Sequence, residues 1–214
     1  MSKLDNHQQE IAALLFSLPE ADRYALAGGA ALIAHKTIER QTRDLDAFIE
    51  ARPETPPGDV TELLHALIPS LRRLGWEPTT IREHQTFARI VARKDAVVVE
   101  VDLAVDAPRL FPTEIVDGLP TLSRQDLAAR KILTILDRAE GRDFTDLHAL
   151  QNLYTRPACI EWAQQLDAGL KTNAIAAAFT NIDRLDDREL PTSKPHDIRR
   201  LFTTWIEELR RADT

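Results

Sequence analysis

Apolar positions in the first half of the chain recur with two different periods. Ile11, Leu14 and Leu15 lie at helical spacing ahead of Pro19, which predicts a helix over residues 6–17. Leu45, Ala47 and Ile49 instead alternate with the residues between them, which predicts a strand, and the segment 96–104, rich in β-branched residues, is typical of a central strand. The same patterns predict further strands over residues 24–27, 43–50, 77–82 and 86–93, and helices over residues 30–36 and 60–74.

From Ser123 onward the apolar period is that of helices alone. The segments that carry it are 123–141, 143–154, 159–170, 173–182 and 196–211. Three prolines and Gly118 interrupt regular structure between residues 106 and 120. The chain is therefore expected to be an α+β protein with an α+β lobe over residues 1–115, built on a mixed sheet with flanking helices, and a helical lobe over residues 116–214.

Composition narrows the class of protein. With 214 residues, 43% of them hydrophobic, the chain can fill a core without staples, and its single cysteine excludes an intrachain disulfide. The first residues lack the order of a signal peptide, and the apolar runs are too short to span a bilayer, so we expect a cytoplasmic protein. A net charge of -7 argues against sequence-independent coating of nucleic acid.

The strongest chemical signal lies between residues 24 and 50. Asp44 and Asp46 are separated by two positions on a predicted strand, so they point to one face, roughly 7 Å apart along the backbone. Upstream, Gly28 and Gly29 form a predicted turn where a phosphate can approach the backbone. A carboxylate pair that can hold a divalent metal beside such a turn indicates metal-dependent chemistry on a nucleoside triphosphate.

A later strand supplies a third carboxylate. Asp102 shares a face of segment 96–104 with Glu100, and we take Asp102 as the third metal ligand, with Glu100 and Asp106 as the alternatives. Three carboxylates around two divalent ions would orient a triphosphate, and Asp102 could also act as general base. An isolated pair of aspartates would instead be read as a solvated strand face.

These elements resemble a known superfamily. The order of a diglycine, a short helix, RxTxDLD and a later strand acid is similar to the polymerase-β-type nucleotidyltransferase core. More narrowly, AGGAALIAHKTIERQTRDLD followed by DLAARKILTILDRAEGRDFTDL resembles the AbiEii/AbiGii family of toxin nucleotidyltransferases, which includes the MenT-type toxins that modify tRNA. The resemblance spans residues 24–150.

The resemblance implies a role for each matching residue. Gly28 and Gly29 would form the phosphate-side turn, and the metal ligands would be Asp44 and Asp46. Further residues are implied on the nucleotide side: Arg40 or Arg43 beside the phosphates, Thr42 two positions before the first aspartate, Lys131 reaching the phosphates, Arg138 two helical turns further along, and Asp143 or Asp146 at the late acidic position. Ala30 stands where many relatives carry Thr or Ser.

Two of these positions also have purely structural interpretations. Arg138 and Asp143 could form an ion pair that locks two helices. Asp143 could also be a helix N-cap, because DFTD resembles a capping box, and Asp146 would then be the functional acid.

The implied function is Mg²⁺- or Mn²⁺-dependent transfer of a nucleoside monophosphate from an NTP to an acceptor, by resemblance the 3′ end of tRNA. The chain would be the toxin of a toxin–antitoxin system, with an antitoxin as protein partner and no membrane partner, and its helical lobe would complete the active-site cleft. Two alternatives are a nucleotidyltransferase that modifies a small molecule such as an antibiotic, and a noncatalytic partner-binding module on the same fold.

Overall fold

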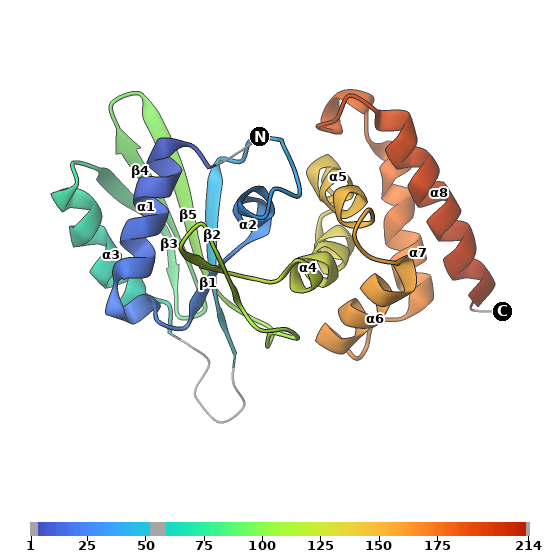
Figure 1. The fold of residues 1–214 in the computed structure, drawn as a ribbon, viewed down its shortest axis with the longest axis horizontal. Helices are drawn as coiled ribbons and strands as arrows, with labels where there is room; N and C mark the ends of the chain where they lie inside the picture. The colour runs from blue at the N-terminus through green and yellow to red at the C-terminus, as the bar shows by residue number, and fades with distance from the viewer. Residues whose placement is uncertain (1–3, 52–58, 213–214) are drawn as a thin grey trace. The chain divides into compact units, whose positions relative to one another are not determined.

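The chain folds into two compact units, Met1–Ser123 and Arg124–Thr214, in a computed structural model that describes residues 4–51 and 59–212. The first unit holds a mixed sheet with helices (Figure 1). Its helices are α1 (Asn6–Ser17), α2 (Gly28–Ala34) and α3 (Thr61–Arg73), with a 3-10 helix at Pro19–Ala21. Its strands are β1 (Tyr24–Ala27), β2 (Asp44–Glu50), β3 (Glu77–His84), β4 (Phe87–Lys94), β5 (Val97–Asp106), β6 (Glu114–Val116) and β7 (Leu119–Thr121).

The sheet has the strand order β3-β4-β5-β2-β1-β7-β6. β2 runs parallel to β5 and β1 runs parallel to β7, whereas the other neighbours are antiparallel. The central strand β2 alternates along its length: Leu45, Ala47 and Ile49 are buried, and Asp44 and Asp46 are half-buried. This alternation places both aspartates on the face opposite Leu45, as the sequence predicted.

The apolar face of the sheet is covered by α1 and α3, which contact β5, β3 and β4. Asp5 begins α1 because its side chain accepts hydrogen bonds from the backbone N–H groups of His7 and Gln8, each at 2.8 Å. Gln8 completes the capping box by accepting from the Asp5 N–H at 3.1 Å. α2 instead follows β1 directly and contacts β1 and β2.

β6 and β7 form a hairpin in the stretch where the sequence predicted only an interruption. Asp117 and Gly118 join them with φ values of 48° and 81°, the left-handed backbone that a two-residue hairpin turn requires. Leu26 of β1 pairs with Thr121 of β7, which attaches the hairpin to the sheet. The first unit therefore extends to Ser123, past the boundary expected at residue 115.

The second unit is helical throughout its described residues. Its helices are α4 (Arg124–Asp137), α5 (Gly141–Leu150), α6 (Arg156–Leu166), α7 (Thr172–Phe179) and α8 (Pro195–Ala212), with 3-10 helices at Thr180–Arg184 and Asp187–Glu189. Phe202 of α8 packs edge-on against Phe144 of α5 and Phe179 of α7, with ring centroids 4.9 and 5.0 Å apart. These buried aromatic side chains form the centre of the unit.

The predicted α+β fold is confirmed, and every predicted helix and strand has a counterpart within a few residues of its expected ends. In the described part of the chain, no helix is both long enough and apolar enough to cross a membrane. Cys159 in α6 is fully buried, and burial raises the pKa of its thiol to about 12.

Candidate functional site

The diglycine turn lies against the second aspartate of β2. Gly28 has a φ of 57°, a conformation that favours glycine, and a Cβ added there would lie 1.8 Å from Oδ2 of Asp46. Ala27, the residue before it, pairs with Asp46 across β1 and β2. The absence of a side chain at Gly28 is therefore what allows the Asp46 carboxylate to lie against the turn.

The second glycine faces two other candidates. A Cβ added at Gly29 would lie 3.0 Å from Nη2 of Arg40 and 3.1 Å from Oγ1 of Thr42. The Thr42 hydroxyl in turn donates a hydrogen bond to Oδ1 of Asp44. The structure thus gathers Gly29, Arg40, Thr42 and Asp44 at the start of α2, whereas Arg43 has an exposed side chain and uses its backbone carbonyl to accept from the Glu100 N–H at 3.2 Å.

Asp102 lies next to Asp46 but is already bound to a cation of the protein. Asp46 and Asp102 are register partners across β2 and β5, and Arg89 of β4 is the partner of Asp102 on its other side. The guanidinium donates from Nε to Oδ1 at 2.7 Å and from Nη2 to Oδ2 at 2.5 Å, so both oxygens of Asp102 accept from it. This hydrogen bond, with the charges of Asp102, Glu100 and Asp44, raises the pKa of Arg89 above its ordinary value.

Arg89 was not among the residues that the sequence suggested. It lies in a predicted strand, but its pairing with Asp102 depends on the register between β4 and β5, which the sequence does not state. The sequence pointed to Arg89 only weakly. Arg89 lies on the strand face opposite the apolar residues Ala88 and Ile90.

The register also separates the alternatives for a third carboxylate. Glu100 is the partner of Asp44 and Asp102 is the partner of Asp46, whereas Asp106 is the partner of Glu50. Asp106 therefore lies four residues beyond Asp102, about 13 Å along the strand. Register places Asp102 and Glu100, rather than Asp106, beside the aspartate pair.

The three carboxylates predicted to hold metal lie on neighbouring strands, Asp44 and Asp46 on β2 and Asp102 on β5. Within residues 4–51 and 59–212, no group of three or more His, Cys, Asp or Glu side chains is placed to hold a metal ion. Asp44 and Asp46 nevertheless fit a divalent cation such as Mg²⁺, which commonly takes one or two carboxylates and completes its coordination with phosphate oxygens and water. Each oxygen of Asp102 accepts one N–H of Arg89.

The later candidates form a buried ionic cluster in the second unit. Nζ of Lys131 on α4 lies 3.0 Å from Oδ1 of Asp143 and 2.7 Å from Oδ2 of Asp146, both on α5. The two aspartates are fully buried, and the Lys131 side chain is 8% exposed. The three side chains therefore join α4 to α5, and Lys131 is buried rather than solvated.

The ion pair suggested for Arg138 and Asp143 is present. Nε of Arg138 donates to Oδ2 of Asp143 at 3.0 Å, and Nη2 donates to Oδ1 at 3.1 Å. Burial raises the pKa of Asp143, but the hydrogen bond from Arg138 and the charge of Lys131 outweigh it and hold the pKa below its usual range. The N-cap interpretation of Asp143 is wrong, because α5 begins at Gly141 after Glu140 and the Asp143 carboxylate binds these cations instead.

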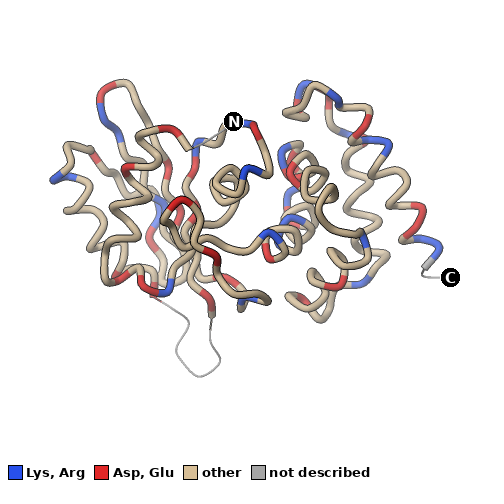
Figure 2. The backbone as a smooth tube through the Cα atoms, in the orientation of Figure 1, with Lys and Arg blue, Asp and Glu red and all other residues tan. Residues whose placement is uncertain are grey.

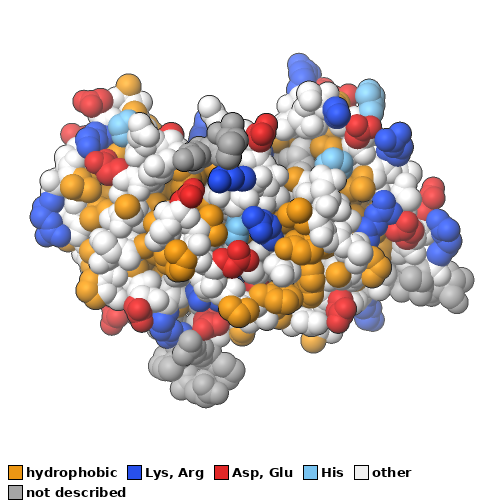
Figure 3. All heavy atoms as spheres, viewed as in Figure 1, with side chains coloured by type: hydrophobic (Ala, Val, Ile, Leu, Met, Phe, Trp, Pro, Cys, Tyr) orange, Lys and Arg blue, Asp and Glu red, His pale blue; other side chains and the backbone are white. Residues whose placement is uncertain are grey.

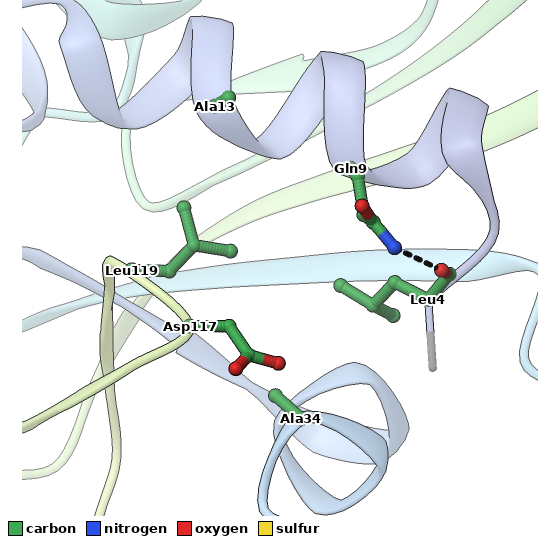
Figure 4. Close-up of a pocket in the computed structure, with 6 residues that line it drawn as sticks. All are labelled: Leu4, Gln9, Ala13, Ala34, Asp117 and Leu119. Carbon is green, nitrogen blue, oxygen red and sulfur yellow. Dashed lines mark hydrogen bonds between the residues drawn. The ribbon is translucent and has the colours of Figure 1, made fainter. Parts of the chain in front are cut away.

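A separate pocket lies elsewhere in the first unit. It has a volume of about 380 Å³ and lies among α1, the end of α2 and the β6–β7 turn (Figure 4). Its lining residues are Leu4, Gln9, Ala13, Ala34, Asp117 and Leu119. None of the candidate residues is among them, so this pocket is not the site built around Asp44 and Asp46.

A mixed sheet that holds an aspartate pair against a glycine turn is the arrangement that the sequence predicted for a nucleotidyltransferase. A family model described as "Nucleotidyl transferase AbiEii toxin, Type IV TA system" matches residues 13–212. The chain belongs to this AbiEii family of toxin nucleotidyltransferases. A comparison with curated protein sequences gives no match.

Solved structures support the fold. A putative nucleotidyltransferase from Helicobacter pylori has a TM-score of 0.59 at 15% identity, covering 98% of this chain and 97% of that one. The nucleotidyltransferase toxin MenT4 of Mycobacterium tuberculosis H37Rv has a TM-score of 0.54 at 14% identity, covering 95% and 91%. The antibiotic-resistance factor ANT(2″)-Ia has a TM-score of 0.54 at 12% identity, covering 77% and 94%.

Family membership implies an NTP substrate, a divalent metal and an antitoxin partner. It makes the chain a nucleotidyltransferase toxin of a toxin–antitoxin system.

Proposed function

We propose that this chain transfers a nucleoside monophosphate from an NTP to the 3′ end of an RNA, most specifically tRNA, in a reaction that depends on Mg²⁺ or Mn²⁺. The observation that carries the proposal is the contact of Gly28 with Asp46, which joins a phosphate-accessible turn to an aspartate pair in a member of a nucleotidyltransferase toxin family.

The chemistry follows from the residues around α2. The acceptor hydroxyl gives its proton to solvent water, its oxygen forms a bond to the α-phosphorus, and the bond from that phosphorus to the pyrophosphate oxygen breaks, which releases pyrophosphate. Arg40 and the backbone at Gly29 would contact the phosphates, and Thr42 orients Asp44 through its hydrogen bond. A divalent cation bound by Asp44 and Asp46 would neutralise charge on the triphosphate.

Lys131 and Asp146 belong to the proposal as the family's late basic and acidic positions. Lys131 and Asp146 also form a buried ion pair that joins α4 to α5 within the second unit. We propose that Lys131 also contributes positive charge toward the nucleotide phosphates, the role that the resemblance to the family implies for it.

The direct test is label transfer. The purified full chain is incubated with Mg²⁺, total tRNA and each of the four α-labelled NTPs in turn, and we expect label on tRNA with at least one of them. Oxidising the tRNA 3′ end with periodate should abolish transfer if that end is the acceptor. Asp46→Asn should lower transfer by about 100-fold or more, whereas Asp95→Asn, the same change in the exposed β4–β5 turn, should leave it unchanged.

The same assay distinguishes an RNA acceptor from a small-molecule acceptor. Label on a cationic aminoglycoside but not on RNA would overturn the RNA proposal in favour of a small-molecule acceptor. A folded, metal-binding chain that labels neither acceptor, and whose Asp46→Asn variant still arrests growth on expression, would instead support the noncatalytic alternative.

A further inference from the structure

One row of side chains crosses the sheet at the level of the candidate site. Arg89 of β4, Asp102 of β5, Asp46 of β2 and Ala27 of β1 are successive register partners, and Gly28 follows Ala27 in the chain. Paired residues of neighbouring strands share a face, so Arg89, Asp102 and Asp46 all project to the side that carries Asp44. The row therefore places a guanidinium two strands from the aspartate pair, about 10 Å across the sheet.

Two hydrogen bonds and burial fix the Arg89–Asp102 pair. Asp102 is 6% exposed, and each of its oxygens accepts one N–H of Arg89. A second divalent cation bound at Asp102 would lie next to the guanidinium and would be repelled by it. Since Arg89 stays charged at any ordinary pH, a second ion would have to share the carboxylate with the guanidinium or displace it, in either case against its positive charge.

Arg89 keeps donors for a substrate. A guanidinium has five N–H groups, and Asp102 takes two of them. The remaining donors have no acceptor among the described residues, and the Arg89 side chain is 39% exposed. The pairing thus fixes the orientation of the guanidinium while leaving an edge that a phosphate oxygen can reach.

We propose that this site binds its nucleoside triphosphate with one divalent cation, held by Asp44 and Asp46, and that Arg89, fixed by Asp102, supplies the positive charge that a second cation would otherwise supply. Asp102 is then a positioning residue for Arg89 rather than a third metal ligand. The proposal rests on the proposed nucleotidyl transfer for its substrate but concerns the number of ions, which is measured without turnover.

The test counts Mn²⁺ ions on the full chain. Native mass spectrometry with Mn²⁺ and a nonhydrolysable NTP analogue should show one ion per chain with the analogue bound. Arg89→Gln frees the Asp102 carboxylate and should raise the count to two, and Arg89→Gln combined with Asp102→Asn should return it to one. Arg82→Gln is the matched control: Arg82 is the exposed register partner of Arg89 on β3, and its loss should leave the count at one.

Each other result counts against the proposal. Two ions on the unaltered chain, falling to one in Asp102→Asn, would make Asp102 a metal ligand. An Arg89→Gln count that stays at one would show that Arg89 does not exclude a second ion. The unaltered chain decides the main point even if a variant fails to fold. Failure to label any acceptor would overturn the proposed reaction and leave the ion count standing, whereas no bound ion at all would overturn both.

Discussion

At the scale of single residues, the site depends on the absence of a side chain at Gly28. A hydrogen in place of a side chain gives Asp46 its room, and the left-handed backbone there further favours glycine. Gly118 has the same kind of backbone, with a φ of 81°, but a Cβ there would meet no atom within 4 Å. The two glycines therefore separate the cost of the backbone from the cost of displacing the aspartate.

We expect Gly28→Ala and Gly118→Ala to lose a similar backbone contribution to the free energy of unfolding, about 1–2 kcal/mol. Only Gly28→Ala must also move Asp46, so its rate of nucleotide transfer should fall by about 100-fold, and its affinity for Mn²⁺ should weaken. Thermal unfolding and initial transfer rates measure the two effects. Equal transfer rates in the two variants would show that the contact with Asp46 has no functional weight.

At the scale of elements, the period of apolar residues predicted most helices and strands, because a period of two or 3.6 fixes which face is buried. The hairpin β6–β7 was not predicted, because strands of three residues are too short to show a period of apolar residues. Its Asp117-Gly118 turn was nevertheless a usable signal.

Some features of the candidate site could likewise be predicted from the sequence, and others could not. The common face of Asp44 and Asp46 follows from strand alternation within β2, so the sequence alone could predict it. The bonding of Asp102 to Arg89 depends on the register between two strands, and the burial of Lys131 depends on how α4 packs against α5. Both are tertiary properties that no local pattern contains.

The contact between α4 and α5 gives a prediction about stability. Asp143 accepts from both Lys131 and Arg138 while fully buried, so Asp143→Asn should lower the free energy of unfolding by about 3–5 kcal/mol at neutral pH, because it leaves a buried cation short of a partner. Asp137→Asn removes the same charge from an exposed position at the end of α4 and should cost less than about 0.5 kcal/mol. Chemical denaturation measures both.

The pH dependence of the same cluster has a definite sign. The pKa of Asp143 is lower in the folded chain than the value of about 3.9 expected when unfolded. The contribution of ionised Asp143 to the free energy of unfolding is therefore complete above about pH 4, and it is lost as the pH falls through the pKa of the folded chain. Asp143→Asn should show a smaller loss of stability between about pH 5 and pH 2 than the unaltered chain, and an identical acid profile would contradict this assignment.

At the scale of the whole molecule, charge constrains how an RNA could bind. Acidic and basic residues are interspersed along both units (Figure 2), and both signs are scattered over the visible surface of each (Figure 3). The net charge is -7. Such a surface releases few counterions from a polyanion.

We therefore expect tRNA to bind the Asp46→Asn chain weakly in the absence of NTP, with a dissociation constant above about 10 μM at physiological salt. The logarithm of the affinity should fall with that of the salt concentration with a slope of magnitude below about 3. Fluorescence anisotropy of labelled tRNA over a salt series measures both. Nanomolar affinity with a steep slope would point to an extended basic surface that the charge distribution does not indicate.

Cys159 has a practical consequence for such experiments. The chain contains one thiol, which is buried in α6 and has a pKa raised to about 12, so almost none of it is thiolate at neutral pH. A cysteine introduced at any exposed position would thus be the one site that a maleimide dye modifies, without first removing a native residue. The protein is in effect ready for site-specific fluorescent labelling in either unit.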